Sequence, residues 1–160
     1  MPSTYTPIAT ASGTGSNATI TFSSIPSTYT DLILIIGGGS TSASVVSQLQ
    51  FNSDTGSNYS WTALFGTGSA ASSARATNTT SAGNCITSNI STTTIYSIMN
   101  YSNTTTNKTV IGRGNATDAI VDARVSMWRN TAAINRIDVT FNSGNFASGT
   151  VVTLYGVKSA

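Results

Sequence analysis

The sequence predicts an all-β protein, a jelly-roll-like antiparallel β-sandwich of about ten short strands. Stretches rich in β-branched and aromatic residues recur roughly every dozen residues, and turns of Gly, Ser, Asn and Asp separate them. No window keeps apolar residues at helical spacing over three turns. Cys85 is the only cysteine, so the paired cysteines of antibody domains are absent, which favours a jelly roll. The 160 residues (1–160) are long enough to form a single domain with its own core.

The first five predicted strands are bounded by clear turn signals. Pro7 lies near the start of the first strand and suits an edge position. Residues 31–36 are continuously aliphatic, as in a central strand covered on both faces. In the fifth strand Tyr59 and Trp61 share one face. The five strands are predicted at residues 5–11, 18–22, 31–36, 45–51 and 59–65.

Residues 66–83 are expected to form a long exposed loop. The segment is nearly all Ala, Ser, Thr, Gly and Asn, and it lacks large apolar side chains. It therefore has little to bury in a core, and it is interpreted either as the least ordered part of the fold or as an ordered contact arm.

The second half of the chain returns to regular alternation. In the segment 119–128, Val121, Val125 and Met127 are predicted to face the core, while Asp122 and Arg124 face solvent. The segment 134–141 repeats this pattern. The strands predicted in this half are residues 85–90, 93–101, 108–113, 119–128, 134–141 and 151–157.

The charge content argues against catalysis. Only 8% of the residues are charged, against about 25% in ordinary soluble domains, and histidine and glutamate are both absent. General acid–base catalysis and metal binding depend on those side chains, so we expect no enzyme, no cofactor and no metal. The net charge of +2 is too small to predict a nucleic-acid or membrane partner.

The few groups that resemble chemical sites have simpler explanations. Asp118 and Asp122 would lie on one strand face about 13 Å apart, too far for a glycosidase pair. Asn52, Asp54 and Gly56 are interpreted as a turn between strands and not as a Ca²⁺ loop. The lone Cys85 is interpreted as a small buried hydrophobic residue.

Aromatic and arginine side chains are the candidates for contact with a ligand or partner. Aromatic rings beside Asn, Ser and Arg can stack on the apolar face of a sugar, although rings on strands more often pack in a core or a subunit interface. Trp128, Arg129 and Arg75 are the candidates expected to be exposed. The full set of interface or glycan contacts is Tyr5, Tyr59, Trp61, Arg75, Trp128 and Arg129.

Several ordered segments resemble one family of proteins. They are residues 5–10 (YTPIAT), 20–26 (ITFSSIP), 51–59 (FNSDTGSNY), 135–137 (NRI), 143–146 (SGNF) and 153–157 (TLYGV). Together they are similar to the small β-rich virion-surface proteins of tailed bacteriophages, which include head decoration (cement) proteins and tail-fibre domains. The resemblance implies a jelly-roll-like fold and symmetric assembly, and it implies no binding residues.

Two functions follow as expectations. The first is a head decoration (cement) protein that binds the capsid surface, stabilises it and assembles with copies of itself as a trimer. The alternative is a tail-fibre or receptor-binding protein that recognises host surface polysaccharide. No signal peptide is visible at Met1 to Tyr5, so synthesis in the host cytoplasm and a final place on the virion surface are expected.

Overall fold

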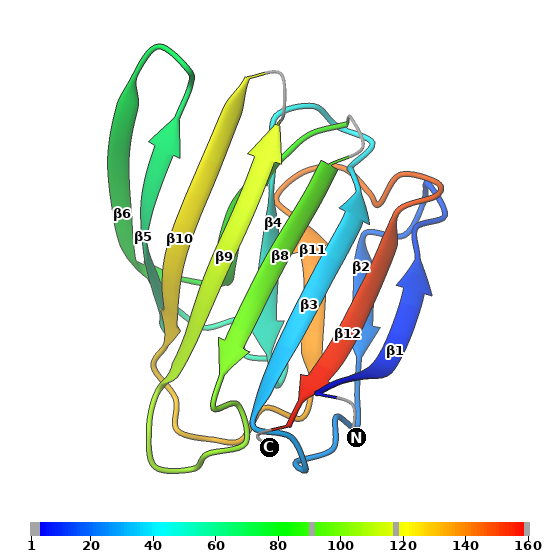
Figure 1. The fold of residues 1–160 in the computed structure, drawn as a ribbon, viewed down its shortest axis with the longest axis vertical. Coiled ribbons are helices and arrows are strands. Elements are labelled where there is room, and N and C mark those ends of the chain that lie inside the picture. The colour runs from blue at the N-terminus through cyan, green and yellow to red at the C-terminus, as the bar shows by residue number, and fades with distance from the viewer. Residues whose placement is uncertain (1–3, 90–91, 117–118, 159–160) are drawn as a thin grey trace.

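The computed structural model describes residues 4–89, 92–116 and 119–158. These residues form antiparallel strands in two packed sheets and contain no helix (Figure 1), which confirms the predicted all-β sandwich. The strands are β1 (Tyr5–Ser12), β2 (Thr19–Phe22), β3 (Asp31–Gly38), β4 (Val45–Phe51), β5 (Tyr59–Gly66), β6 (Ala71–Thr79), β7 (Ala82–Thr87), β8 (Thr92–Met99), β9 (Lys108–Ala116), β10 (Ile120–Trp128), β11 (Ile137–Phe141) and β12 (Val151–Val157).

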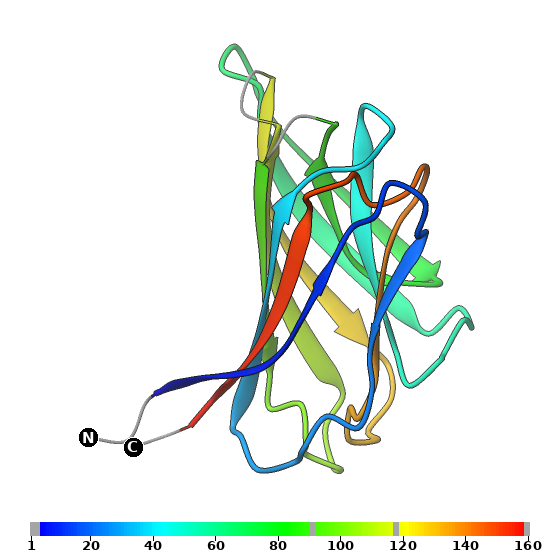
Figure 2. The ribbon, with the colours of Figure 1, turned by 90° about the vertical axis from the view of Figure 1, so that its right-hand side faces the viewer.

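The two sheets differ in size. The larger sheet has eight strands in the order β1-β12-β3-β8-β9-β10-β5-β6, and the smaller has four in the order β2-β11-β4-β7. Figure 2 shows the two layers from the side. Buried apolar residues of both sheets form one core. The jelly-roll connectivity expected from the sequence stays a prediction.

The core is built from alternate residues of each strand. In β3, Leu32, Leu34 and Ile36 are buried, and in β4 the inward residues include Leu49 and Phe51. This is the period of two that a pleated strand imposes. The second predicted strand follows it as well, since Ile20 and Phe22 of β2 are both buried.

A tyrosine ties the two sheets together. Tyr96 of β8 is fully buried, and its hydroxyl donates to the Ser47 carbonyl oxygen at 2.9 Å and accepts from the Cys85 N–H at 3.2 Å. Ser47 is on β4 and Cys85 on β7, so one side chain of the larger sheet satisfies backbone groups of two strands of the smaller sheet. A buried hydroxyl needs such partners, and here they also fix the distance between the layers.

The segment 66–83 corrects the sequence prediction. It contains no long loop, because β6 occupies 71–79 and β7 begins at Ala82. β6 pairs with β5 from Gly66↔Ala71 to Tyr59↔Thr79. Its small side chains gave no strand signal, since an edge strand of this kind is held by backbone hydrogen bonds to its neighbour and not by burial.

The prediction for residues 31–36 is confirmed in part. β3 lies inside the larger sheet, between β12 and β8. Ile33 and Ile35 point to the outer face, however, and are only half-buried. The strand is therefore covered fully on one face, since the smaller sheet packs on that face alone.

Candidate functional site

The alternation along β10 is the reverse of the sequence prediction. Asp122, Arg124 and Trp128 face the core, and Val121 and Val125 face solvent. Trp128 lies on the same face of the strand as the two charged residues. Burying its large indole gains more free energy than burying a smaller valine or methionine. The charged pair follows the tryptophan inward, and the aliphatic side chains of the strand are left outside.

Large apolar side chains consequently gather on the outer face of the larger sheet. This face is toward the viewer in Figure 1. Isolated exposed apolar residues are normal on a protein surface, but a contiguous group marks an interaction site. The group, here called the outer patch, consists of Leu64 (64% exposed), Val121 (59%), Val125 (52%), Ile111 (43%), Met99 (39%) and Met127 (36%).

Strand register makes the outer patch continuous. Val125 of β10 lies opposite Ile111 of β9, and Leu64 of β5 lies opposite Ala123 of β10. Because Ala123 is small, a shallow hollow of about 210 Å³ remains there, with Leu64, Ile111 and Val125 in its wall. The outer patch is therefore a flat apolar surface with a depression near its centre.

Two arginines border the outer patch. Arg75 lies opposite Thr62, and Arg113 lies opposite Ala123. Among the described residues, the ion pairs are Arg124–Asp122 and Arg136–Asp138, so neither bordering arginine has a carboxylate partner there. Their guanidinium groups can receive an acidic or carbonyl-rich partner surface.

The outer face of the smaller sheet has a different chemistry. Its outward positions are mostly hydroxyls and amides (Thr19, Thr21, Gln48, Gln50 and Thr140), with Val46 and Ile86 as a half-buried apolar pair. The large apolar side chains that are exposed on the described part of the sandwich therefore lie on the larger sheet and not on the smaller one.

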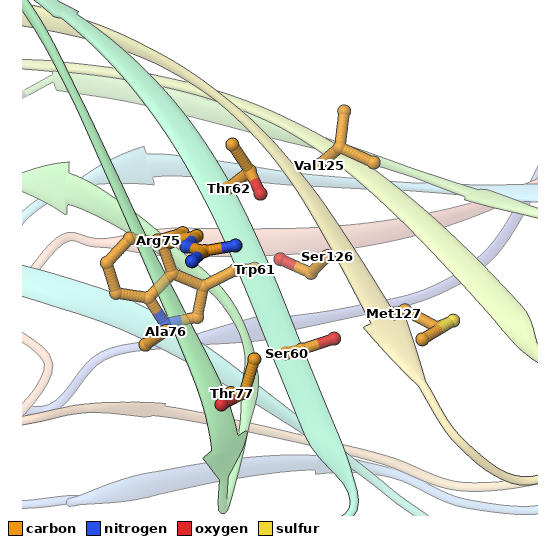
Figure 3. Close-up of a pocket in the computed structure, with 9 residues that line it drawn as sticks. All are labelled: Ser60, Trp61, Thr62, Arg75, Ala76, Thr77, Val125, Ser126 and Met127. Carbon is orange, nitrogen blue, oxygen red and sulfur yellow. The ribbon is translucent and has the colours of Figure 1, made fainter.

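Trp61 and Arg75 both line one hollow of about 270 Å³ (Figure 3), although strand register directs their side chains to opposite faces of the larger sheet. The hydroxyl residues Ser60, Thr62 and Thr77 line it as well. These are two of the predicted contact residues, and they come from the neighbouring strands β5 and β6. This hollow borders the outer patch, because Val125 and Met127 belong to both.

Tyr59 and Trp128 are core residues, which corrects their interpretation as contact residues. Both are fully buried, with ring centroids 6.2 Å apart in a stacked pair. The Trp128 Nε1–H donates to Asp54 Oδ2 at 2.7 Å. Their rings therefore present no face to a ligand.

Arg129 and Tyr5 do not join a common site. Arg129 donates from Nη2 to the Ser57 carbonyl oxygen at 2.6 Å and to Asn78 Oδ1 at 3.0 Å, which holds the turn before β5 against the end of β6. Tyr5 is 55% exposed on β1, at the opposite edge of the larger sheet from β6. Of the six predicted residues, only Trp61 and Arg75 therefore share a hollow.

The turn around Asp54 is structural, as predicted. Asp54 Oδ1 accepts from the Gly56 N–H at 2.9 Å and from Asn58 Nδ2 at 3.1 Å. Burial alone would raise the pKa of this carboxyl, but the hydrogen bonds from Trp128, Asn58 and Gly56 outweigh it and lower the pKa. Both oxygens of the Asp54 carboxylate therefore accept hydrogen bonds from groups within the fold.

Cys85 is buried, as predicted, and burial raises the pKa of its thiol to about 12. Asp118, the other half of the rejected carboxylate pair, lies outside the described residues. Within the described ranges, no three His, Cys, Asp or Glu side chains are grouped so that they could hold a metal ion. The same ranges include no helix long and apolar enough to cross a membrane.

Comparison with protein-family models, curated proteins and solved structures gives no match to this chain. The fold and its surfaces are therefore the observations from which a function can be proposed. The residues of the outer patch were not predicted as a site. The sequence signal that could have revealed them is that Trp128 lies on the opposite face of β10 from Val121, Val125 and Met127.

Proposed function

We propose that this protein is a structural, non-enzymatic component of a bacteriophage virion, a head decoration (cement) protein that coats the capsid surface and stabilises it. The observation that carries the proposal is the outer patch, six large apolar side chains exposed together on one broad face. A surface of this kind gains free energy when another protein covers it, at about 25 cal/mol per Å² of apolar area removed from water.

The one-sided chemistry of the sandwich supports coating in particular. A coat protein needs one face that adheres to the particle and one that stays in water. The apolar outer face of the larger sheet and the hydroxyl- and amide-rich face of the smaller sheet fit these two roles. Few charges also means little repulsion between copies packed on a lattice.

The bordering arginines indicate the chemistry of the capsid surface that would be bound. Arg75 and Arg113 flank apolar residues, so a complementary surface has an apolar centre and carboxylates at its rim. Such rim charges steer and orient the partner, while burial of the outer patch provides most of the affinity.

Copy number tests the proposal. Quantitative mass spectrometry on purified virions of the phage that encodes this chain should find the protein in hundreds of copies per particle, which is about the stoichiometry of a capsid lattice. Absence from the particles would contradict a virion role altogether. A handful of copies would contradict decoration and support a tail-fibre role.

The tail-fibre alternative is supported by the hollow that Trp61 and Arg75 line (Figure 3). The Arg75 guanidinium and the hydroxyls of Thr62 and Thr77 project from the same face of the sheet and can bind the hydroxyl groups of a sugar. The Trp61 ring, however, lies on the inner face of the sheet, where the buried Arg124 guanidinium is 4.6 Å from its centroid, so it does not share the face of Arg75. We therefore place this role second.

A further inference from the structure

β6 is an edge strand, and its stretch 71–77 lacks the features that usually protect an edge. The strand runs for nine residues along the border of the larger sheet (Figure 1), and all of them except Ala76 and Thr79 are exposed. It contains no proline and no lysine, and Arg75 is its only charge. Proteins normally shorten, charge, bulge or cover such an edge, because its free N–H and C=O groups pair with other strands.

The other three sheet edges are protected in recognisable ways. β1 contains Pro7, and its pairing with β12 is interrupted by a bulge between Pro7 and Ala9. β2 has only four residues. β7 is bulged in its pairing with β4 and is covered by contacts with β9 and β10. β6 has one bulge, at Asn78 near its end, so among the described strands its stretch 71–77 alone presents a long, regular and uncovered edge.

The hairpin fixes which backbone groups of β6 point outward. The Thr67 N–H donates to the Ala70 carbonyl oxygen at 3.0 Å, so these two residues form the hydrogen-bonded pair that closes the hairpin. Pairs alternate along an antiparallel ladder, so Ser73 and Arg75 belong to non-hydrogen-bonded pairs with β5. Their N–H and C=O groups are directed away from the sheet, toward any added strand.

We propose that this edge pairs with β6 of a second copy of the chain, antiparallel and centred on Ala74. In this register Ser73 of each copy lies opposite Arg75 of the other. The outward N–H and C=O groups of these residues then form the hydrogen bonds between the two strands. The register also keeps the two arginines from facing each other directly, which would be unfavourable. The side chains at the junction are Ala and Ser, small enough for the strands to approach without obstruction.

Pairing of the two β6 strands gives a dimer with two-fold symmetry. Its two-fold axis passes through the Ala74 pair, perpendicular to the sheet, so the larger sheet continues from one copy into the other. The outer patches of both copies then lie on the same side. The interface uses both β6 edges and leaves none free, so it closes as a dimer and does not propagate. The proposed dimer differs from the trimer expected from the sequence, which stays an untested prediction.

Disulfide trapping tests the register. In the proposed dimer the two Ala74 residues form a non-hydrogen-bonded pair with Cα atoms about 4.5 Å apart, within the range that a disulfide spans. A74C should therefore form a covalent dimer under mild oxidation. A76C is the matched control, since its two copies would be about 13 Å apart along the strands. The native Cys85 is buried and takes no part.

Solution mass tests the pairing itself. By light scattering the unmodified protein should have twice the 16.4 kDa chain mass. S73P removes an outward N–H without breaking the ladder to β5, and should return the mass to that of one chain. S73T keeps the N–H and should stay dimeric.

A monomeric or trimeric unmodified protein, or equal cross-linking of A74C and A76C, would overturn the proposal. Should S73P fail to fold, the two cysteine variants still decide the question. These experiments use purified protein without particles, so their failure is distinguishable from failure of the proposed virion role.

Discussion

Asp122 and Arg124 illustrate, at the scale of single residues, how this chain accommodates charge in its interior. Arg124 Nε lies 2.7 Å from Asp122 Oδ2, and both side chains are almost fully buried. The guanidinium carbon is also 4.6 Å from the ring centroid of Trp61 and 5.1 Å from that of Phe65. The carboxylate further accepts the Ile86 N–H at 3.1 Å, which connects β10 to the smaller sheet.

We predict that removing one partner of this buried pair is severe and that removing the second charge restores part of the loss. Arg124→Met should lower the free energy of unfolding by about 3–5 kcal/mol, because it leaves a buried carboxylate without its cation. Adding Asp122→Asn removes that charge while keeping an acceptor for Ile86. The double variant should therefore be more stable than Arg124→Met alone.

Urea unfolding followed by tryptophan fluorescence measures these differences. Arg136→Met provides a comparison, because the Arg136 side chain is exposed to solvent, and its loss should cost much less stability than the loss of Arg124. Strictly additive losses at Asp122 and Arg124 would show that the two charges do not stabilise each other.

At the scale of the elements, close packing of β9 against the core depends on a glycine, Gly112. A Cβ at Gly112 would meet the Cys85 sulfur and would lie 2.8 Å from Tyr96 Cε1. Tyr96 cannot withdraw, because its hydroxyl is held by Ser47 and Cys85. Gly66 on β5 differs, since its nearest atom to a built Cβ is Val121 Cγ2 at 3.5 Å.

The predicted effects of alanine at these two strand glycines have opposite signs. Gly112→Ala should destabilise the fold by about 1–3 kcal/mol through overpacking. Gly66→Ala should stabilise it by about 0.5–1 kcal/mol, since alanine loses less backbone entropy in a strand. Thermal melts of both variants check this, and Cys85→Ala should partly rescue Gly112→Ala. Equal melting temperatures for the two variants would refute the packing explanation.

The strands also show which parts of the fold can be predicted from sequence patterns. Strands such as β2, β4 and β11 were predicted because their apolar residues alternate and all face one core. β6 was missed because its edge position leaves its side chains exposed and small. The facing of β10 was reversed, because alternation fixes which residues share a face and not which face is buried.

At the scale of the whole molecule, the decisive feature is the contrast between the two broad faces. A chain with so few charges was expected to act through shape and contact surfaces. Trp61 and Arg75 were identified in advance and line one hollow. The outer patch was not, because its side chains look like core residues in sequence. They lie on the uncovered outer face of the larger sheet because β10 buries its other face, the one that includes Trp128.

The most direct test of the proposed role is binding of purified variants to virions stripped of this protein. Val125→Asp places a charge at the centre of the outer patch and should weaken binding by about tenfold or more, equivalent to about 1.4 kcal/mol. Thr19→Asp, on the polar face, should bind like the unmodified protein, and binding should change little with salt because apolar burial dominates. Equal binding by the two variants would contradict the proposal that the outer patch attaches the protein to the particle.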